Sequence, residues 1–130
     1  MSATVVDSSA WLDFLDGDKE AARRLDPILA KRRVLITGPI YAELLSGARF
    51  TSEYALLKEL LEGIEWAEEP DGLWPRVAEH RFALARRGFA ASLIDLSIAL
   101  AASDGGYRLL TRDRDFARIR TVVPIELDLF

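Results

Sequence analysis

Val5-Val6-Asp7-Ser8-Ser9-Ala10-Trp11 is the stretch of this 130-residue chain that decides its fold. The β-branched residues before Asp7 predict a short buried strand, and the apolar spacing from Ala10 to Leu15 predicts a helix. An aspartate therefore stands where a strand gives way to a helix. The same alternation of strand and helix recurs along the chain and indicates an α/β fold with parallel strands.

The remaining elements follow from hydrophobic spacing and from glycine and proline positions. We expect further strands at 34–37, 64–66, 108–111 and 122–127, and helices at 19–32, 39–47, 51–62, 71–87, 92–102 and 113–119. Pro27 is expected to interrupt its helix, and Pro124 favours an edge position for the last strand. Thr51 or Ser52 is expected to cap the helix that Gly63 ends.

Length and composition predict one globular domain over residues 1–130. Half of the residues are apolar and 29% are charged, so the chain can bury a core. The longest apolar run, Leu93 to Ala102, contains Asp95 and is far shorter than the ~20 residues of a membrane span. The N-terminus has no basic segment typical of a secretory signal, so we expect a cytoplasmic protein without a membrane partner.

The charge of the chain is unevenly distributed. The net charge is −4, with 21 acidic and 17 basic residues. Lys19 to Arg33 holds six bases and two acids, Arg108 to Arg120 holds five arginines and two aspartates, and Glu53 to Asp71 holds seven acids and one lysine. Each cluster taken alone is typical of a solvated helix face, so charge by itself indicates no partner.

Two aspartates follow predicted strands. Asp7 ends the first strand, and Asp113 comes shortly after the strand that ends at Thr111, with Asp115 two residues further on. Ligands of open α/β sheets bind outside the carboxyl ends of the strands, which makes these acids candidates for a site. The alternative for each is a structural role as a helix cap.

Asp95 lies in an otherwise apolar helix, where an isolated ionised carboxylate is expensive to desolvate. It therefore needs a partner or a cation. The alternative is a capping box with Ser92, which requires no function. Glu43, one turn after Pro39, is the fourth candidate, and its alternative is a solvent-facing side chain.

If these acids meet, their mutual repulsion raises their pKa values unless a divalent cation neutralises them. The chain has no cysteine and one histidine, so any metal must be held by oxygen. Such sites suit Mg²⁺ or Mn²⁺ and the hydrolysis of a phosphodiester. Without five site acids the net charge would be +1, which is compatible with RNA.

Four stretches, in order, resemble the successive motifs of PIN-domain nucleases, and most closely the VapC-like toxins of type II toxin–antitoxin pairs. They are Val5 to Trp11, Pro39 to Gly47, Asp95 to Ala99 and Leu110 to Phe116. The resemblance covers essentially the whole chain. It implies a three-layer α/β/α fold with a small, mostly parallel central sheet, and an endoribonuclease that depends on Mg²⁺ or Mn²⁺.

The resemblance also assigns the site residues. The catalytic acids of the family fall on Asp7, Glu43, Asp95 and Asp113, and the metal would be held by Asp7, Asp95, Asp113 and Asp115. Ser9 and Thr111 match the small hydroxyl residues that orient acids or metal-bound water. No catalytic position is substituted, so we expect an active enzyme.

Partners are implied by the same resemblance. We expect an RNA substrate and a VapB-like antitoxin that inserts a basic side chain among the carboxylates. The candidate groove for the antitoxin lies between the helix of Trp11, Leu12 and Leu15 and the helix of Tyr41, Leu44 and Leu45. We also expect a homodimer formed through an apolar helix face, the alternative being that this face fills the monomer core. That face consists of Tyr54, Leu57, Leu60 and Leu61.

Other function classes agree less well with the sequence. A receiver-type response regulator needs a lysine after a late strand, and the last lysine is Lys58. A haloacid-dehalogenase phosphatase needs Asp-x-Asp where this chain has Asp7-Ser8-Ser9. His80 has no obvious nucleophile near it in sequence. The remaining alternative is a catalytically silent PIN-fold module that binds protein or RNA.

Overall fold

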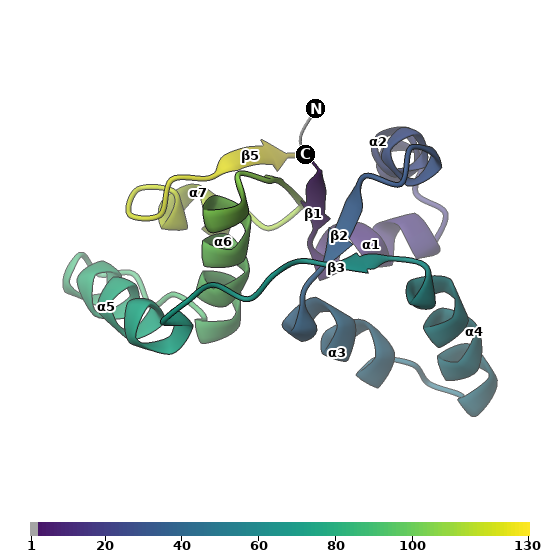
Figure 1. The fold of residues 1–130 in the computed structure, drawn as a ribbon, viewed down its shortest axis with the longest axis horizontal. Helices are drawn as coiled ribbons and strands as arrows, with labels where there is room; N and C mark the ends of the chain where they lie inside the picture. The colour runs from purple at the N-terminus through teal and green to yellow at the C-terminus, as the bar shows by residue number, and fades with distance from the viewer. Residues whose placement is uncertain (1–2) are drawn as a thin grey trace.

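The structure, a computed structural model, describes residues 3–130. Five parallel strands form one sheet in the order β3-β2-β1-β4-β5, and helices flank it (Figure 1). The strands are β1 (Thr4–Val6), β2 (Val34–Ile36), β3 (Glu65–Trp66), β4 (Arg108–Thr111) and β5 (Glu126–Leu129). The helices are α1 (Ser8–Leu15), α2 (Lys19–Ala30), α3 (Gly38–Ser46), α4 (Thr51–Glu62), α5 (Leu73–Arg86), α6 (Leu93–Gly105) and α7 (Asp115–Ile119). The expected α/β/α fold with a parallel sheet is confirmed.

The core extends from the central strands to α6 and to buried residues of α1 through α5. Val5 and Val6 of β1 and Leu109 of β4 are fully buried. Helix α6 is apolar nearly all round, and its residues 96–102 are buried, as is typical of a helix inside a domain. Figure 1 shows α3 and α4 on one side of the molecule, α5 and α6 on the other, and β1 and β2 between them.

The sheet register brings together two strand ends that are far apart in sequence. Val6 is paired with Leu110, and the Asp7 N–H donates to the Leu110 carbonyl at 2.9 Å. Since β1 and β4 are parallel, Asp7 and Thr111 leave the sheet side by side at the same edge. This edge carries the candidate site.

The expected interruption of a helix at Pro27 is wrong, whereas the expected edge position of the last strand is confirmed. Helix α2 continues through the exposed Pro27 instead of breaking there, because water can solvate the carbonyl that loses its helical donor. The last strand does lie at a sheet edge, but β5 begins at Glu126 and leaves Pro124 outside it. Pro124 has no N–H for the ladder, so pairing starts only after it.

Two helix ends also differ from expectation. Phe50, not Thr51 or Ser52, holds the N-cap position of α4, and it makes no side-chain cap. Helix α6 runs on to Gly105, and Gly106 ends it with a φ of 67°. Most other boundaries lie within two residues of expectation, α7 among them, which starts at Asp115 instead of Asp113. Within residues 3–130, no helix combines the length and apolarity needed to span a bilayer.

Candidate metal centre

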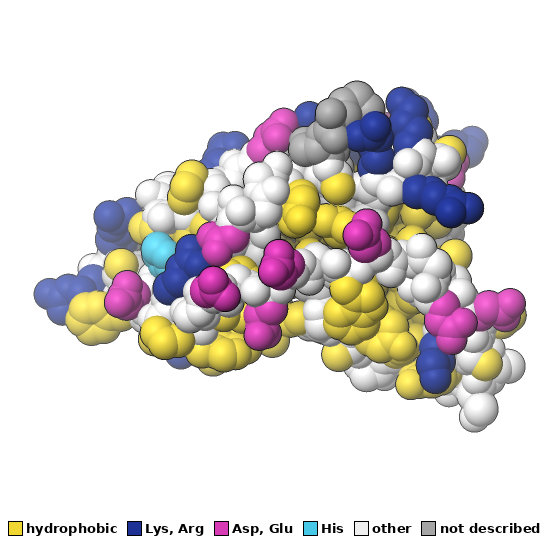
Figure 2. All heavy atoms as spheres, in the orientation of Figure 1, with side chains coloured by type: hydrophobic (Ala, Val, Ile, Leu, Met, Phe, Trp, Pro, Cys, Tyr) yellow, Lys and Arg dark blue, Asp and Glu magenta, His cyan; other side chains and the backbone are white. Residues whose placement is uncertain are grey.

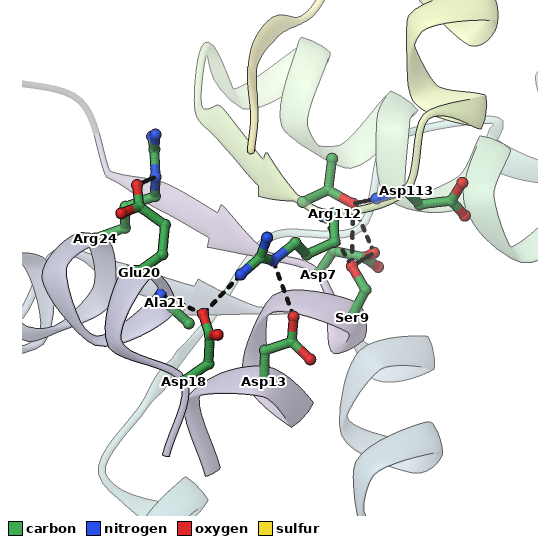
Figure 3. Close-up of polar contacts among 10 residues, drawn as sticks. Asp7, Ser9, Asp13, Asp18, Glu20, Ala21, Arg24, Arg112 and Asp113 are labelled. Carbon is green, nitrogen blue, oxygen red and sulfur yellow. Dashed lines mark hydrogen bonds and ion pairs between the residues drawn. The ribbon is translucent and has the colours of Figure 1, made fainter. Parts of the chain in front are cut away.

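Asp7 is buried, with 4% of its surface exposed, and two hydroxyl groups hold its carboxylate. Ser9 Oγ and Thr111 Oγ1 donate to Asp7 Oδ2 at 2.7 and 2.8 Å. The same two oxygens accept from the N–H groups of Arg112, at 3.1 Å, and Asp113, at 2.9 Å (Figure 3). We call Ser9 and Thr111 the hydroxyl cradle. It stabilises the negative charge of Asp7 and links β1 to the segment after β4.

Three further acids meet beside this cradle. Carboxylate oxygens of Asp95, Asp113 and Asp115 lie within 4.8 Å of one another, and we call these residues the acid cluster. Asp95 comes from the first turn of α6, Asp113 from the segment after β4, and Asp115 from the start of α7. Asp113 Oδ1 also accepts from the Asp115 N–H at 2.9 Å, which fixes the loop between them.

The pKa of Asp95 shows how close these charges are. The pKa of the Asp95 carboxyl is raised from 3.8 to about 7, first by burial and then by the negative charges of Asp7, Asp113, Glu43 and Asp115, in that order of importance. Ser92 does cap α6, since its Oγ accepts from the Asp95 N–H at 3.2 Å. The cap uses the backbone of Asp95, and its carboxylate lies in the acid cluster.

Glu43 is an exposed residue of α3, which agrees with the alternative expectation of a solvent-facing side chain. Its pKa is nevertheless raised, first by partial burial of the carboxyl and then by the charge of Asp7, against a hydrogen bond from Ser8. Glu43 and Asp7 therefore lie within electrostatic reach of each other. Neither belongs to the acid cluster itself.

The acid cluster has the properties of a divalent-cation site. Its three residues offer only carboxylate oxygens, which are hard ligands, and within residues 3–130 no Lys or Arg forms an ion pair with them. An arrangement of this kind leaves several negative charges uncompensated, and a bound dication would neutralise them.

The structure shows a role for Arg112 that the sequence pattern does not indicate. Its guanidinium forms ion pairs with Asp13 at 2.9 Å and Asp18 at 2.6 Å, and it lies 4.1 Å from the ring centroid of Phe130. The pKa of Asp18 is held below its usual value mainly by the hydrogen bond from the Ala21 N–H; burial, the second-largest effect, opposes this, and the Arg112 guanidinium adds to the lowering. Figure 3 shows the guanidinium pointing toward these acids and Asp113 pointing the other way. Asp13 and Asp18 lie far from Arg112 in the sequence, so local spacing gives no signal of these ion pairs.

Comparisons with known proteins agree with this geometry. The PIN domain family model matches residues 4–122. Ribonuclease VapC11 of Mycobacterium tuberculosis is 28% identical over 97% of this chain and 98% of its own. Ribonuclease VapC21 of the same species is 30% identical over 79% of this chain and 78% of its own. A chain in the crystal structure of VapBC-5, a member of the VapBC family of toxin–antitoxin systems from M. tuberculosis, superposes on this chain with a TM-score of 0.69. The two sequences are 26% identical, and the alignment covers 100% of both chains. The chain belongs to the PIN-domain family, and within it to the VapC ribonucleases.

Proposed function

We propose that this ribonuclease is the toxin of a type II toxin–antitoxin pair and that Mg²⁺ or Mn²⁺ binds at the acid cluster and Asp7. We also propose that residues 1–130 act as one domain in the cytoplasm. The observation that carries the proposal is the uncompensated negative charge around Asp95, whose pKa is raised to about 7. A protein that used this fold only for binding would gain nothing from such costly repulsion.

Each site residue has a separate task in this proposal. Asp95, Asp113 and Asp115 provide ligand oxygens, and Asp7 adds Oδ1, because the hydroxyl cradle occupies its Oδ2. A divalent cation bound there would lower the pKa of the attacking water and stabilise charge on the leaving oxygen. The Glu43 carboxylate, near Asp7 and open to solvent, orients that water by accepting a hydrogen bond from it.

A cleavage assay with single-stranded RNA tests the proposal. Cleavage should require Mg²⁺ or Mn²⁺, stop in EDTA and return when the metal is restored. Binding of RNA without cleavage at any concentration of these metals would support the silent binding module instead.

We also propose that a VapB-like antitoxin places an arginine among the carboxylates. The guanidinium pairs with two oxygens at once and would compete with the cation. Of the groove expected between α1 and α3, Trp11, Leu44 and Leu45 are buried where these helices pack together, so only its exposed residues Leu12 and Leu15 remain open to the antitoxin. Co-expression with a neighbouring antitoxin gene should yield a complex whose activity recovers as Mg²⁺ is increased. A complex that cleaves as fast as the free protein would contradict inhibition at this site.

The homodimer stays part of the proposal, with α4 as its interface. Of the four residues expected in this apolar face only Leu61 is fully buried, while Tyr54 and Leu60 are each 43% exposed. The alternative that the face fills the monomer core is therefore wrong for Tyr54 and Leu60. Leu56 is also exposed, and together with Leu60 it lines a surface hollow that Leu15 of α1 completes. Sedimentation at micromolar concentration should give twice the mass of 14.5 kDa, and Leu60→Glu should give the monomer.

A further inference from the structure

The arginines beyond residue 75 fall into two groups. Arg76, Arg108 and Arg112 form ion pairs with carboxylates. Six others have no carboxylate partner within residues 3–130: Arg81 donates to the Ala91 carbonyl at 3.1 Å, Arg120 follows the end of α7, and the remaining four lie at the end of α5 and along α7 or just before it. They are Arg86, Arg87, Arg114 and Arg118, and all four are exposed.

Aromatic rings alternate with these arginines. The Arg86 guanidinium lies 5.5 Å from the centroid of Phe82, which is 64% exposed, and that of Arg118 lies 5.0 Å from the centroid of Phe89. The second contact joins α7 to the segment between α5 and α6. We call the four arginines with Phe82 and Phe89 the basic rim.

The basic rim adjoins the acid cluster. Arg114 lies between Asp113 and Asp115 in the chain, and Arg118 is one turn further along α7. Phe89 precedes the start of α6, where Asp95 lies. Beside Phe82 is a mainly apolar hollow whose lining includes Ala85 and Leu93. Figure 2 shows basic side chains at the tip of the molecule formed by α5.

We infer that the basic rim binds single-stranded RNA next to the cleaved bond, an inference that rests on the proposed function. Free arginines attract phosphates, and exposed rings stack on unpaired bases regardless of their identity. A protein partner would instead have to supply a carboxylate for each unpaired guanidinium. RNA backbone supplies these charges at regular intervals and must in any case reach the acid cluster.

A charge-matched pair of variants tests the inference. The rim variant is Arg86→Gln/Arg114→Gln/Arg118→Gln. The control is Lys19→Gln/Lys31→Gln/Arg32→Gln, which removes three exposed cations without carboxylate partners at α2 and the turn after it. Binding of a fluorescent single-stranded RNA is measured by anisotropy in EDTA, where no cleavage occurs, over a series of salt concentrations.

The rim variant should bind RNA about 10-fold more weakly, with a salt slope reduced by about 2, and the control should stay near the wild-type protein. Phe82→Leu keeps an apolar side chain without the ring and should weaken binding about 5-fold. Circular dichroism establishes that each variant is folded.

Three results would overturn the inference: no RNA binding by the wild-type protein, equal losses in the two triple variants, or a rim variant that binds RNA normally but loses the antitoxin. The last would make the basic rim a protein interface. If the wild-type protein cleaves RNA while the rim variant binds it normally, the inference alone fails. If the basic rim binds RNA and no metal supports cleavage, the proposed function fails.

Discussion

Asp7 and Asp95 lie at the same edge of the molecule, yet their surroundings have opposite effects on a negative charge: those of Asp7 stabilise it and those of Asp95 destabilise it. Asp7 is buried against two hydroxyl donors that are themselves fixed by backbone N–H groups. Asp95 is half-buried among other acids, and its pKa is raised to about 7. The protein itself stabilises the charge of Asp7, whereas the charge of Asp95 depends on something from outside.

This difference separates a permanent part of the site from a conditional one. The hydroxyl cradle exists because β1 and β4 pair in parallel, so it forms whenever the sheet forms. The acid cluster stores electrostatic repulsion that a cation can release. Mutations in the two places should therefore have different consequences for activity and for stability.

The largest effect is expected for Asp95→Asn in RNA cleavage. The amide keeps the shape of the side chain but removes a charge that the cation needs, so the cleavage rate should fall by about 100-fold or more. The measurement is the initial rate at saturating Mg²⁺. Asp26→Asn, an exposed acid of α2, serves as control and should leave the rate unchanged. Undiminished activity of Asp95→Asn would contradict the assignment of Asp95 as a metal ligand.

Sequence reasoning could locate the acids because strand ends are visible in hydrophobic spacing. Asp7 and Asp113 were found in that way, and Asp95 was conspicuous as a charge in an apolar helix. Glu43 was a weaker candidate, an acid one turn after Pro39, and the family resemblance then assigned it to the catalytic set. The hydroxyl cradle was likewise implied by resemblance, whereas its bonds to the backbone of residues 112 and 113 depend on strand pairing.

The sequence could not reveal interactions and solvent exposure that arise only when distant parts of the chain come together in the fold. Arg112 depends on Asp13, Asp18 and Phe130, which only the folded chain brings near it. Pro27 is tolerated because it faces water, and that exposure follows from how α2 packs. Local patterns carry neither kind of information.

A second prediction concerns the hydroxyl cradle. Thr111→Val removes a buried donor to Asp7 and the acceptor for the Asp113 N–H, so cleavage should fall by about 10-fold through misplacement of both acids. Thr111→Ser keeps the hydroxyl and should retain most of the activity. If Val and Ser behave alike, the cradle does not position the site and the contrast with the acid cluster is lost.

Stability in the absence of metal should respond in the opposite direction at Asp95. The carboxyl ionises near pH 3.8 in the unfolded chain and at about 7 in the folded one, so ionisation disfavours folding increasingly between these values and fully above pH 7. In EDTA at pH 8, Asp95→Asn should therefore raise the free energy of unfolding by about 1–2 kcal/mol, allowing for screening by water.

Thermal unfolding from pH 4 to 8 measures this gain. It should be small near pH 4, close to the unfolded-state pKa of 3.8, because most of the penalty builds up between that value and about 7, and it should shrink when Mg²⁺ is added to both proteins. Asp7→Asn should be less stable than Asp95→Asn at pH 8, because it gives up charge-assisted bonds from the hydroxyl cradle. A gain for Asp95→Asn that is independent of pH would point to helix propensity rather than to charge.

The smallest effect is expected for Asp115→Asn. Asp115 is the exposed member of the acid cluster, and among the charges that raise the pKa of Asp95 its contribution is the smallest. The bond from its N–H to Asp113 Oδ1 is a backbone contact that the substitution leaves in place. Cleavage at saturating Mg²⁺ should fall by less than about 10-fold, and the Mg²⁺ concentration for half-maximal rate should rise a few-fold, since water can replace an exposed ligand. A Mg²⁺ titration of the cleavage rate separates the two effects. A loss as large as that of Asp95→Asn would mean that burial does not rank these carboxylates, and the distinction between a permanent and a conditional part of the site would have to be drawn elsewhere.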